Sequence, residues 1–328
     1  MKTLLLIEKT EIILNFKKSF MESFQKLGIN SICYEVDKEK SFEIQRKEIL
    51  QSIHDNHITA CLMINDITKD KEFFMTKDIL HATPCYVWFV DAALRMKRKD
   101  PNLQCYKEIY TFEPQDIAYG MRVYGRKFKY LPLTAGDSIF CSHPDKEPYV
   151  YDLSFIGLVA GCPKRLEILD AVAEYCAQHG KKMICYGHFW HNSHTLQRIA
   201  GAIRFKIKHP YLYKYIINKR IEPYEAAKIY KCTRINLNIH IPQHTGFNCR
   251  TFEILGNSNF ELCDIQNTDS IHFEDGKHIV FYRNTQEVLE KIKYYLQHDT
   301  EREQIAAQGG KYVREYYSFN KILGKIFQ

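Results

Sequence analysis

Short apolar runs alternate with amphipathic stretches along the first part of the chain. Six apolar runs are expected to form β-strands, at residues 3–8, 30–36, 58–65, 84–91, 107–112 and 128–134. Stretches with apolar residues at helical spacing follow the first three, at 11–27, 41–55 and 76–81. Strands that alternate with helices are typical of βαβ units and a parallel sheet.

A polar segment interrupts this pattern, which then begins again. After it, strands are expected at 153–160, 182–187, 234–240, 260–264 and 278–282, with a helix at 163–180 and helical sequence from residue 285. We therefore predict an α/β protein with two Rossmann-like, doubly wound domains. In such sheets ligands bind at the carboxyl ends of the strands, and between two domains the natural site is the cleft.

The same pattern predicts where the domains lie. We assign residues 1–136 to the first domain, 137–152 to a linker and 153–318 to the second domain. Residues 319–328 form a tail, and one possibility is that it packs back on the first domain. A basic insertion is expected at about 188–220, and its part 204–220 has six Lys or Arg residues with no acid before Glu222. This part is either a solvated basic face or a surface for anionic lipid or a charged acceptor.

Composition indicates a globular protein, with 45% hydrophobic and 26% charged residues. No run approaches the ~20 apolar residues that cross a bilayer, and the apolar run 4–7 is too short for a secretion signal. Eleven cysteines without a C-x-x-C pair lie mostly in apolar runs, which favours buried thiols and a cytoplasmic protein. The net charge of +7 favours an anionic partner without naming one.

Several common ligand motifs are missing from the sequence. It contains no G-x-G-x-x-G after the first strand, no P-loop, no Asp-x-Asp and no G-x-S-x-G. His188, His191 and His194 are spaced by three, but no carboxylate or thiol pattern completes a metal site. We therefore predict no metal site, and we read His188 as a loop residue at a strand end that reaches an anionic ligand.

The segment 245–264, TGFNCRTFEILGNSNFELCD, is the most informative part of the sequence. It reads as a loop, a short helix and a strand, and it follows the predicted strand 234–240. Free N–H groups and the helix dipole favour a phosphate at such a helix start, and Arg250 could add a forked contact. Glu253 suits paired sugar hydroxyls, so the segment fits a nucleotide or sugar phosphate. The alternative is that Glu253 is a first-turn acid paired with Arg250.

Residues 151–318 resemble the C-terminal half of GT-B glycosyltransferases, most of all the spore-maturation-protein-like group with a "glycosyl transferases group 1" C-terminal domain. The matching pieces are DLSFIG (152–157), KRLEIL (164–169), ICYG (184–187), YEAAKIYKCTRINLNIH (224–240), GFNCRTFEILGNSNFELCD (246–264), HIVFYRNTQEVLEKIKYYL (278–296) and EREQIAAQGGKYV (301–313). PCYVWFVDAA (84–93) and KYLPLTA (129–135) match more loosely. The sequence departs from the usual family pattern at two places. The residues after Glu-Ile-Leu are the polar Gly256-Asn257-Ser258-Asn259, and a glycine-rich loop after the first strand is absent.

The resemblance implies an enzyme that moves a sugar from a nucleotide sugar to an acceptor, with the donor on the second domain and the acceptor on the first. In such enzymes the glutamate that matches Glu253 holds the donor ribose. The donor-site residues implied are Gly157, Arg165, Gly187, His188, Asn238, His240, Gly246, Phe247, Asn248, Arg250, Thr251 and Glu253.

The resemblance also suggests a mechanism. The leaving diphosphate would be neutralised by Arg250 and Arg165 and by the helix dipole, without a bound metal. Asp91, which ends the fourth strand, is expected to face the acceptor as a base or as a group that orients a hydroxyl. The alternative is that Asp91 caps the following helix. The related group-1 enzymes imply retention of configuration at the transferred sugar.

Other functions and several details stay open on the sequence. A sugar-nucleotide epimerase, a phosphorylase and a non-catalytic nucleotide-sugar-binding subunit are alternatives on the same architecture. No tightly bound cofactor and no nucleic-acid partner is expected, and the co-substrate is a UDP-, GDP-, ADP- or TDP-linked sugar. The acceptor is a glycan, such as a cell-surface polysaccharide, a lipid-linked glycan or a protein. A place at the inner face of the membrane, through 204–220, is a further possibility.

Overall fold

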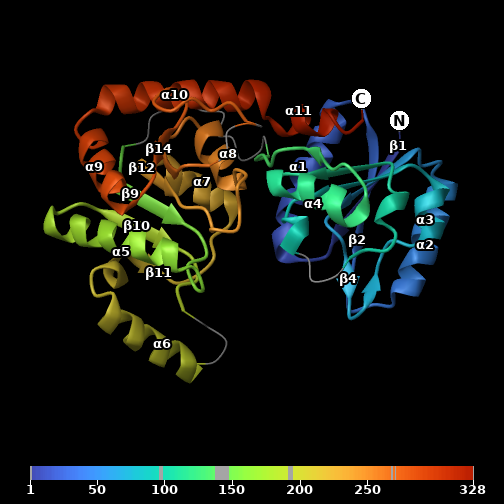
Figure 1. Ribbon diagram of the computed structural model, residues 1–328, viewed down its shortest axis with the longest axis horizontal. Coiled ribbons are helices and arrows are strands. Elements are labelled where there is room, and N and C mark those ends of the chain that lie inside the picture. The colour runs from blue at the N-terminus through green and yellow to red at the C-terminus, as the bar shows by residue number, and fades with distance from the viewer. Residues whose placement is uncertain are drawn as a thin grey trace.

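The protein folds around two parallel β-sheets, as the sequence predicts (Figure 1). The computed structural model describes residues 2–95, 99–136, 148–190, 195–266, 269 and 271–327. The expected linker 137–152 falls largely outside these residues, so its conformation stays a prediction. Within the described residues, no helix is both long and apolar enough to cross a membrane.

The first sheet has six strands, all paired in parallel. Their order is β2 (Asn30–Val36), β1 (Lys2–Glu8), β3 (Ala60–Ile64), β6 (Cys85–Phe89), β7 (Glu108–Thr111) and β8 (Lys129–Tyr130). Around it lie α1 (Glu11–Lys26), α2 (Phe42–Asp55), α3 (Lys77–Ala82), α4 (Pro114–Tyr124), the 3-10 turns η1 (Ala93–Arg95) and η2 (Leu103–Cys105), and the antiparallel pair β4 (Thr68–Lys69) and β5 (Glu72–Phe73).

The second sheet repeats this design with six parallel strands. Their order is β11 (Ile216–Ile217), β10 (Met183–Tyr186), β9 (Tyr151–Ile156), β12 (Thr233–Asn238), β13 (Glu261–Asp264) and β14 (Val280–Tyr282). The helices of this half are α5 (Pro163–Gln178), α6 (Thr195–Lys208), the 3-10 turn η3 (Leu212–Tyr215), α7 (Pro223–Lys231), α8 (Cys249–Gly256), α9 (Thr285–Tyr295), α10 (Asp299–Tyr316) and α11 (Phe319–Gly324).

The central strands of the first sheet form because their apolar runs are buried on both faces. Leu4 to Ile7 of β1 are fully buried, and all five residues of β3 are buried as well. Continuous apolar runs of this kind are the signature of parallel strands covered by helices on each side. Since parallel strands end at the same edge, the loops that follow them gather at one edge of each sheet.

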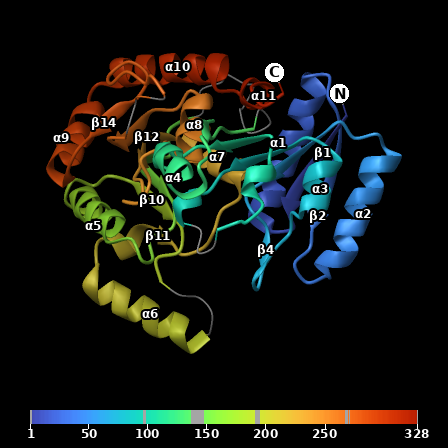
Figure 2. The same ribbon diagram turned by 45° about the vertical axis from the view of Figure 1, so that its right-hand side comes forward.

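The last helix, α11, leaves the second domain and packs on the first. In both ribbon views it lies beside α1, close to the start of the chain (Figures 1 and 2). The ring of Phe319 lies 4.8 Å from that of Phe20 and 6.3 Å from that of Trp88. Aromatic pairs at these separations add to the stability gained by burial, so the end of the chain contributes to the core of the first domain.

The two domains also share apolar packing near the loop before α8. Phe247 and Phe252 of the second domain belong to the same buried cluster as Trp88 and Leu131 of the first. Gly246 packs so closely that a Cβ there would meet the carbonyl oxygen of Phe112 at 2.5 Å. The loop that precedes α8 therefore lies directly against the first domain.

Candidate functional site

Helix α8 is capped at its start by Asn248. The side-chain oxygen of Asn248 accepts hydrogen bonds from the backbone N–H groups of Arg250 at 3.0 Å and Thr251 at 3.4 Å. An N-cap of this kind satisfies donors that a helix otherwise leaves open. The sequence prediction that these N–H groups are free for a phosphate is therefore wrong for two of them, which Asn248 already satisfies.

A buried polar network holds the cap in place. Asn238, at the end of β12, donates to the oxygen of Asn248 at 3.1 Å, to Thr251 at 3.0 Å and to a carboxylate oxygen of Glu261 at 2.8 Å. Thr251 also donates to that oxygen, at 3.0 Å. Since buried polar groups are costly unless they are paired, this network fixes the position of α8 relative to the sheet.

A second chain of contacts supports the same loop through His240. The Nε2 atom of His240 accepts the backbone N–H of Asn248 at 3.1 Å, so Nδ1 must carry the proton and donate to Asp264 at 2.8 Å. Burial lowers the pKa of His240, although Asp264 opposes the change. Burial acts to raise the pKa of Asp264, but bonds with His240 and Lys164 leave it below its usual value. A neutral imidazole thus bridges the loop and β13.

Potential metal ligands come together at one place within the described ranges. His240, Cys263 and Asp264 have ligand atoms within 4.8 Å of one another. Both nitrogens of His240 are engaged, one as an acceptor from Asn248 and one as a donor to Asp264. The imidazole has no lone pair left for a metal, so this group is better explained as a support for the loop.

Two glycines bring the first two loops of the second domain together. Gly187, after β10, has a φ of 152°, and a Cβ there would lie 1.8 Å from the carbonyl oxygen of Gly157, after β9. Gly157 donates its N–H to Tyr186 at 2.9 Å. Any side chain at position 187 would force these loops apart, so the glycine defines the floor of the space in front of α8.

A cavity of about 430 Å³ lies above this floor, within the range typical of small-molecule sites. Its lining comes from loops that follow β9, β10 and β11, from α7 and α8, and from α1 of the first domain. The lining residues are Phe16, Ile156, Gly157, Leu158, Tyr186, Gly187, His188, Arg220, Ile221, Pro223, Ala226, Tyr230, Cys249, Arg250 and Glu253. We call it the inter-domain cavity.

Cationic side chains and one acid line the inter-domain cavity. Arg250 lies in the first turn of α8, and Arg220 and His188 come from two different loops. The Nε of Arg250 is buried without a hydrogen-bond partner among the described residues. Glu253, one turn further along α8, is 7% exposed; burial raises its pKa and the nearby Arg250 opposes part of this rise. Arg250 therefore carries a donor that the described structure leaves unsatisfied, and the carboxylate of Glu253 lies nearby.

The remaining wall of this cavity is apolar. Ile156 packs with Ala226, Tyr230 and Ile254 in a small buried cluster, and Ile221 lies against it. A flat heterocyclic ring is well suited to such a wall, since ligand sites usually combine apolar walls with a few placed polar groups.

Arg165 lies behind the cavity and not in its lining. Its guanidinium donates to the carbonyl oxygens of Ile239 and Leu158, each at 2.6 Å. Burial and the charge of Arg250 lower the pKa of Arg165 to about 10. Arg165 therefore positions two loops of the site and adds positive charge near Arg250.

The first domain fastens the loop before α8 from the opposite side. The buried carboxylate of Glu113 accepts hydrogen bonds from the backbone N–H of Thr245 at 3.2 and 3.1 Å, from the hydroxyl of Thr245, and from His244 at 3.1 Å. Burial acts to raise the pKa of Glu113, but these bonds hold it below its usual value. Charge-assisted bonds of this kind are strong, so the loop is fixed by both domains.

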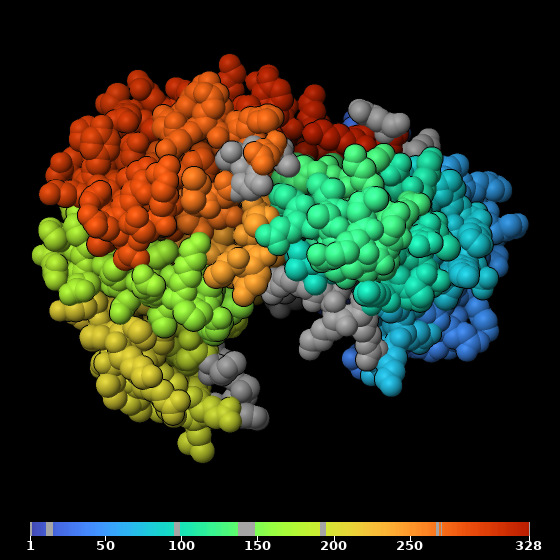
Figure 3. Space-filling model, in the orientation of Figure 1, coloured from blue at the N-terminus to red at the C-terminus, as the bar shows by residue number. Residues whose placement is uncertain are grey.

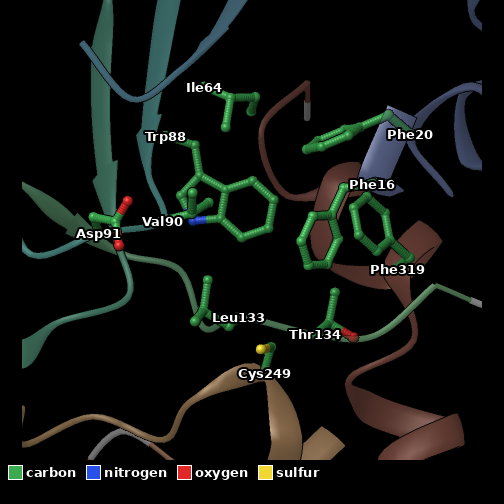
Figure 4. A pocket seen from close by; sticks show the side chains of 10 residues that line it. All are labelled: Phe16, Phe20, Ile64, Trp88, Val90, Asp91, Leu133, Thr134, Cys249 and Phe319. Atoms are coloured by element: carbon green, nitrogen blue, oxygen red, sulfur yellow. The ribbon is translucent and has the colours of Figure 1, made fainter. Parts of the chain in front are cut away.

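A second, smaller cavity of about 180 Å³ adjoins the first on the side of the first domain. Figure 4 shows its lining: Phe16, Phe20, Ile64, Trp88, Val90, Asp91, Leu133, Thr134, Cys249 and Phe319. Phe16 and Cys249 belong to the lining of both cavities. Asp91 supplies the only carboxylate in this lining, and most of the other side chains are apolar. The smaller cavity therefore combines one acid with an apolar wall.

Asp91 does not cap the turn that follows it. Asn65 donates to the Asp91 carboxylate at 3.1 Å, and the N–H groups of Ala93 and Leu94 are bonded instead by Asp116, at 2.7 and 2.9 Å. Asp116, and not Asp91, therefore caps this turn. The carboxylate of Asp91 lies exposed at the edge of the smaller cavity.

Comparison with known proteins agrees with this architecture. The family described as glycosyl transferase-like matches residues 165–328, half of the chain. The chain belongs to this glycosyltransferase family. Spore protein CgeB of Bacillus subtilis (strain 168) is 23% identical in an alignment of 255 positions that covers 74% of this chain and 74% of that protein. The predicted family is therefore confirmed.

Solved structures show the same two-domain fold. Sucrose-phosphate synthase of Thermosynechococcus elongatus superimposes with a TM-score of 0.65 at 10% identity, covering 100% of this chain and 98% of the other. Anabaena HepE in complex with UDP-glucose gives 0.63 at 11% identity, with the same coverage. These are GT-B glycosyltransferases, so the predicted GT-B fold is confirmed.

The structure brings some of the predicted site residues of this glycosyltransferase to the inter-domain cavity and leaves others behind it. Those in the lining are Gly157, Gly187, His188, Arg250 and Glu253. Those outside the lining are Arg165, Asn238, His240, Gly246, Phe247, Asn248 and Thr251, which pack or bond beneath the loops. His191 and His194 fall outside the described residues.

The sequence did not single out Arg220, Tyr186 and Tyr230, which are among the residues that line the cavity. Arg220 had been read as part of the basic surface 204–220, but it lines the inter-domain cavity. Tyr186 precedes Gly187 and Tyr230 lies on α7, and both line the cavity too. The position of Arg220 just before the acid-containing helix α7, at the end of the insertion, is the one local signal that could have separated it from the rest of the basic run.

Proposed function

We propose that this glycosyltransferase binds a nucleoside diphosphate sugar in the inter-domain cavity and transfers the sugar to a hydroxyl group presented by the first domain. The observation that carries the proposal is the combination within one cavity of Arg250, whose Nε has no hydrogen-bond partner in the described structure, the adjacent acid Glu253 and an apolar wall. Phosphates, sugar hydroxyls and a base are the three parts of a nucleotide that such groups recognise.

In this proposal each part of the donor has its own partner. The diphosphate lies between Arg250, Arg220 and His188, which are the cationic or protonatable side chains of the lining. The ribose hydroxyls bond to Glu253, and the base lies against the wall around Ile156 and Ala226. A uridine diphosphate sugar is the first donor to test, because the similarly folded HepE was solved with UDP-glucose.

The transfer step is proposed to use the protein's own cations. As the bond between sugar and diphosphate breaks, negative charge grows on the leaving phosphate. Arg250 and Arg220 in the lining, with Arg165 behind them, are placed to stabilise that charge without a metal. We further propose that the sugar keeps its anomeric configuration, which the product's proton NMR coupling constant would test.

The acceptor hydroxyl is proposed to approach from the smaller cavity. Asp91 is held there by Asn65 and is exposed. It either accepts the proton of the hydroxyl or orients that hydroxyl toward the sugar. Phe16 and Cys249, which line both cavities, mark where donor and acceptor would meet.

A panel of nucleotide sugars tests the proposal. Each is incubated with the protein and candidate acceptors, with and without EDTA, and release of free nucleoside diphosphate is followed. We expect release that Glu253→Ala and Arg250→Ala abolish without unfolding the protein. Tight binding without turnover on any acceptor would favour a binding subunit, and interconversion of the sugar without transfer would favour an epimerase. If no nucleotide sugar shifts the melting temperature, the donor site is wrong.

A further inference from the structure

Helix α6 carries a stripe of aliphatic side chains that nothing in the described structure covers. Leu196 is 82% exposed, Ile199 51%, Ile203 56% and Ile207 75%. Residues three or four apart lie on one face of a helix, so these four form a continuous line along α6. We call this line the α6 stripe. Four large aliphatic residues on a single face are more than the scattered apolar exposure of an ordinary surface.

The opposite face of α6 fastens the helix to the protein. Phe205 is buried, and its ring lies 5.9 Å from that of Phe189 and 5.3 Å from that of Trp190. Just after the helix, His209 bonds to Asp170 of α5 at 3.1 Å. At 3.6 residues per turn Phe205 lies about half a turn away from the centre of the α6 stripe. The stripe therefore points away from the domain.

Basic residues border the stripe on both sides. At 3.6 residues per turn Arg204 and Lys208 lie on one side of the stripe and Lys206 lies on the other, whereas Arg198 lies near the face of Phe205. All four are exposed. The sequence has no acidic residue from 175 to 221, so no acid on this segment offsets their charge.

From this arrangement we propose that α6 lies in the surface of a lipid bilayer that contains anionic headgroups. The apolar stripe would enter the boundary between headgroups and acyl chains, while the flanking cations meet the headgroup phosphates. With 14 residues the helix is about 21 Å long, too short to cross a bilayer but sufficient to lie in its plane.

The shape of the molecule permits such an approach. In both ribbon views α6 lies at the outer end of the second domain, far from the first sheet. Figure 3 shows the same segment, in yellow, as a lobe that projects beyond the rest of the domain. A flat surface can therefore reach the lobe without meeting the body of the protein. A second copy of the chain is a poorer partner, because it would bring the same positive charges to the contact.

The proposal divides the basic segment into two parts. Arg220 lines the inter-domain cavity, whereas the cations of α6 lie on the projecting lobe. Membrane binding by α6 is thus independent of the donor site, and each can fail without the other.

Vesicle co-sedimentation of the whole chain tests the proposal. Sucrose-loaded vesicles of phosphatidylcholine with 30% phosphatidylglycerol, as a chosen composition, are compared with pure phosphatidylcholine. We expect the wild type to bind the anionic vesicles, and we expect high salt to reduce this binding about ten-fold or more. The same loss is expected in two triple variants. One is Leu196→Gln/Ile203→Gln/Ile207→Gln, which removes most of the α6 stripe, and the other is Arg204→Gln/Lys206→Gln/Lys208→Gln, which removes the cations beside it. Glutamine keeps the helix propensity of these positions.

Matched variants serve as controls. Ile44→Gln and Met121→Gln remove exposed apolar residues of the first domain, and Lys18→Gln/Lys293→Gln/Lys311→Gln removes three exposed cations elsewhere. Wild-type binding in these controls, with unchanged circular dichroism in every variant, supports the assignment. The proposal is overturned if the wild type does not prefer anionic vesicles, or if the controls lose as much binding. It is also overturned if sedimentation velocity shows a dimer that the stripe variant dissociates while no vesicle is bound.

Discussion

Glu113 of the first domain and Thr245 of the second are joined by hydrogen bonds to both the backbone and the side chain of Thr245. Glu113 is fully buried and also caps α4 by accepting the N–H of Gln115 at 3.4 Å. Thr245 lies four residues before α8. The helix that carries Arg250 and Glu253 is therefore positioned in part by the opposite domain, which links the arrangement of the domains to the proposed donor site.

Replacing Glu113 tests that link. Glu113→Gln keeps the size of the side chain but removes its charge, and a glutamine offers only one oxygen to the donors of Thr245 and His244. We expect the dissociation constant for UDP to rise about ten-fold, a loss of about 1.4 kcal/mol, as measured by calorimetry. Glu108→Gln, which removes a surface pair with Lys129, is the control. Unchanged UDP affinity in Glu113→Gln would show that the contact does not position the site.

Arg250 and Glu253 are expected to respond differently to nucleotide charge. Arg250→Ala should weaken the nucleoside diphosphate more than the monophosphate, because its guanidinium would bond to phosphate oxygens. Glu253→Ala should weaken both nucleotides by a similar factor, roughly 10- to 100-fold for a lost charged hydrogen bond. Calorimetric titration of UDP and UMP into each variant separates the two. Equal losses for both ligands in Arg250→Ala would contradict the proposed placement.

Asp91 should affect turnover more than donor binding. Asp91→Asn retains an oxygen that can accept from Asn65 but loses the charge and basicity of the carboxylate. We expect kcat to fall about 100-fold or more, in line with the loss of a general base, while UDP affinity stays within about two-fold of wild type. Asp78→Asn, an exposed acid on α3, is the control. A variant with near-normal kcat would remove Asp91 from the reaction.

Gly187 and Gly180 both have positive φ, so alanine substitutions at these two positions can be compared for their effect on the free energy of unfolding. A Cβ at Gly187 would lie 1.8 Å from the carbonyl oxygen of Gly157, whereas a Cβ at Gly180 would meet nothing within 4 Å. We expect Gly187→Ala to lower the free energy of unfolding by about 3 kcal/mol or more, since backbone must move. Gly180→Ala should cost only about 1 kcal/mol, for its left-handed backbone. Urea denaturation of both variants checks the order, and similar values would show that the two loops can separate without cost.

Glu261 should make stability depend on pH. Burial raises the pKa of this carboxyl to about 7, against about 4.3 in the unfolded chain. The folded state then holds a proton that the unfolded state has lost, so the free energy of unfolding falls as pH rises from about 4 to about 7. The group accounts for up to about 4 kcal/mol of this fall. Below pH 4 and above pH 7 its contribution is constant.

Glu261→Gln cannot ionise, so the difference in unfolding free energy between wild type and variant should change by about 2.5 kcal/mol between pH 5 and pH 8. Glu290→Gln, an exposed acid on α9, should show a constant difference. Urea denaturation at several pH values measures both. A constant difference for Glu261→Gln as well would mean that the carboxyl titrates normally in the folded protein.

Strands such as β1, β3 and β6 could be predicted because each contains a continuous apolar run, which is what burial on two faces demands. Helix α4 was missed. Its sequence has Gly120 in the middle, which weakens helix propensity, and the glycine is needed because a Cβ there would meet the ring of Phe128 at 2.5 Å. The two-residue strand β11 was missed as well, because its neighbours are basic and aromatic. Tertiary contacts decided both elements.

The site was predictable where it depends on loops that directly follow strands. Gly157, Gly187 and His188 all have such positions, and the structure brings them together. The sequence could not tell a polar residue that faces the cavity from one that supports the loop. Asn238 and His240 are of the second kind, because their partners on β13 become neighbours only when the sheet forms. Phe16 reaches the cavity from the first domain, and the sequence around it contains no pattern that predicts this position.

The path of α11 has a consequence for how the chain acquires its structure during synthesis. Phe319 and Ile322 complete the buried cluster that contains Phe20 and Trp88, so the first domain lacks part of its interior until those residues have left the ribosome. By then the second domain has been made in full. The two halves cannot mature strictly one after the other, and a nascent chain arrested before residue 319 would expose aromatic surface to chaperones.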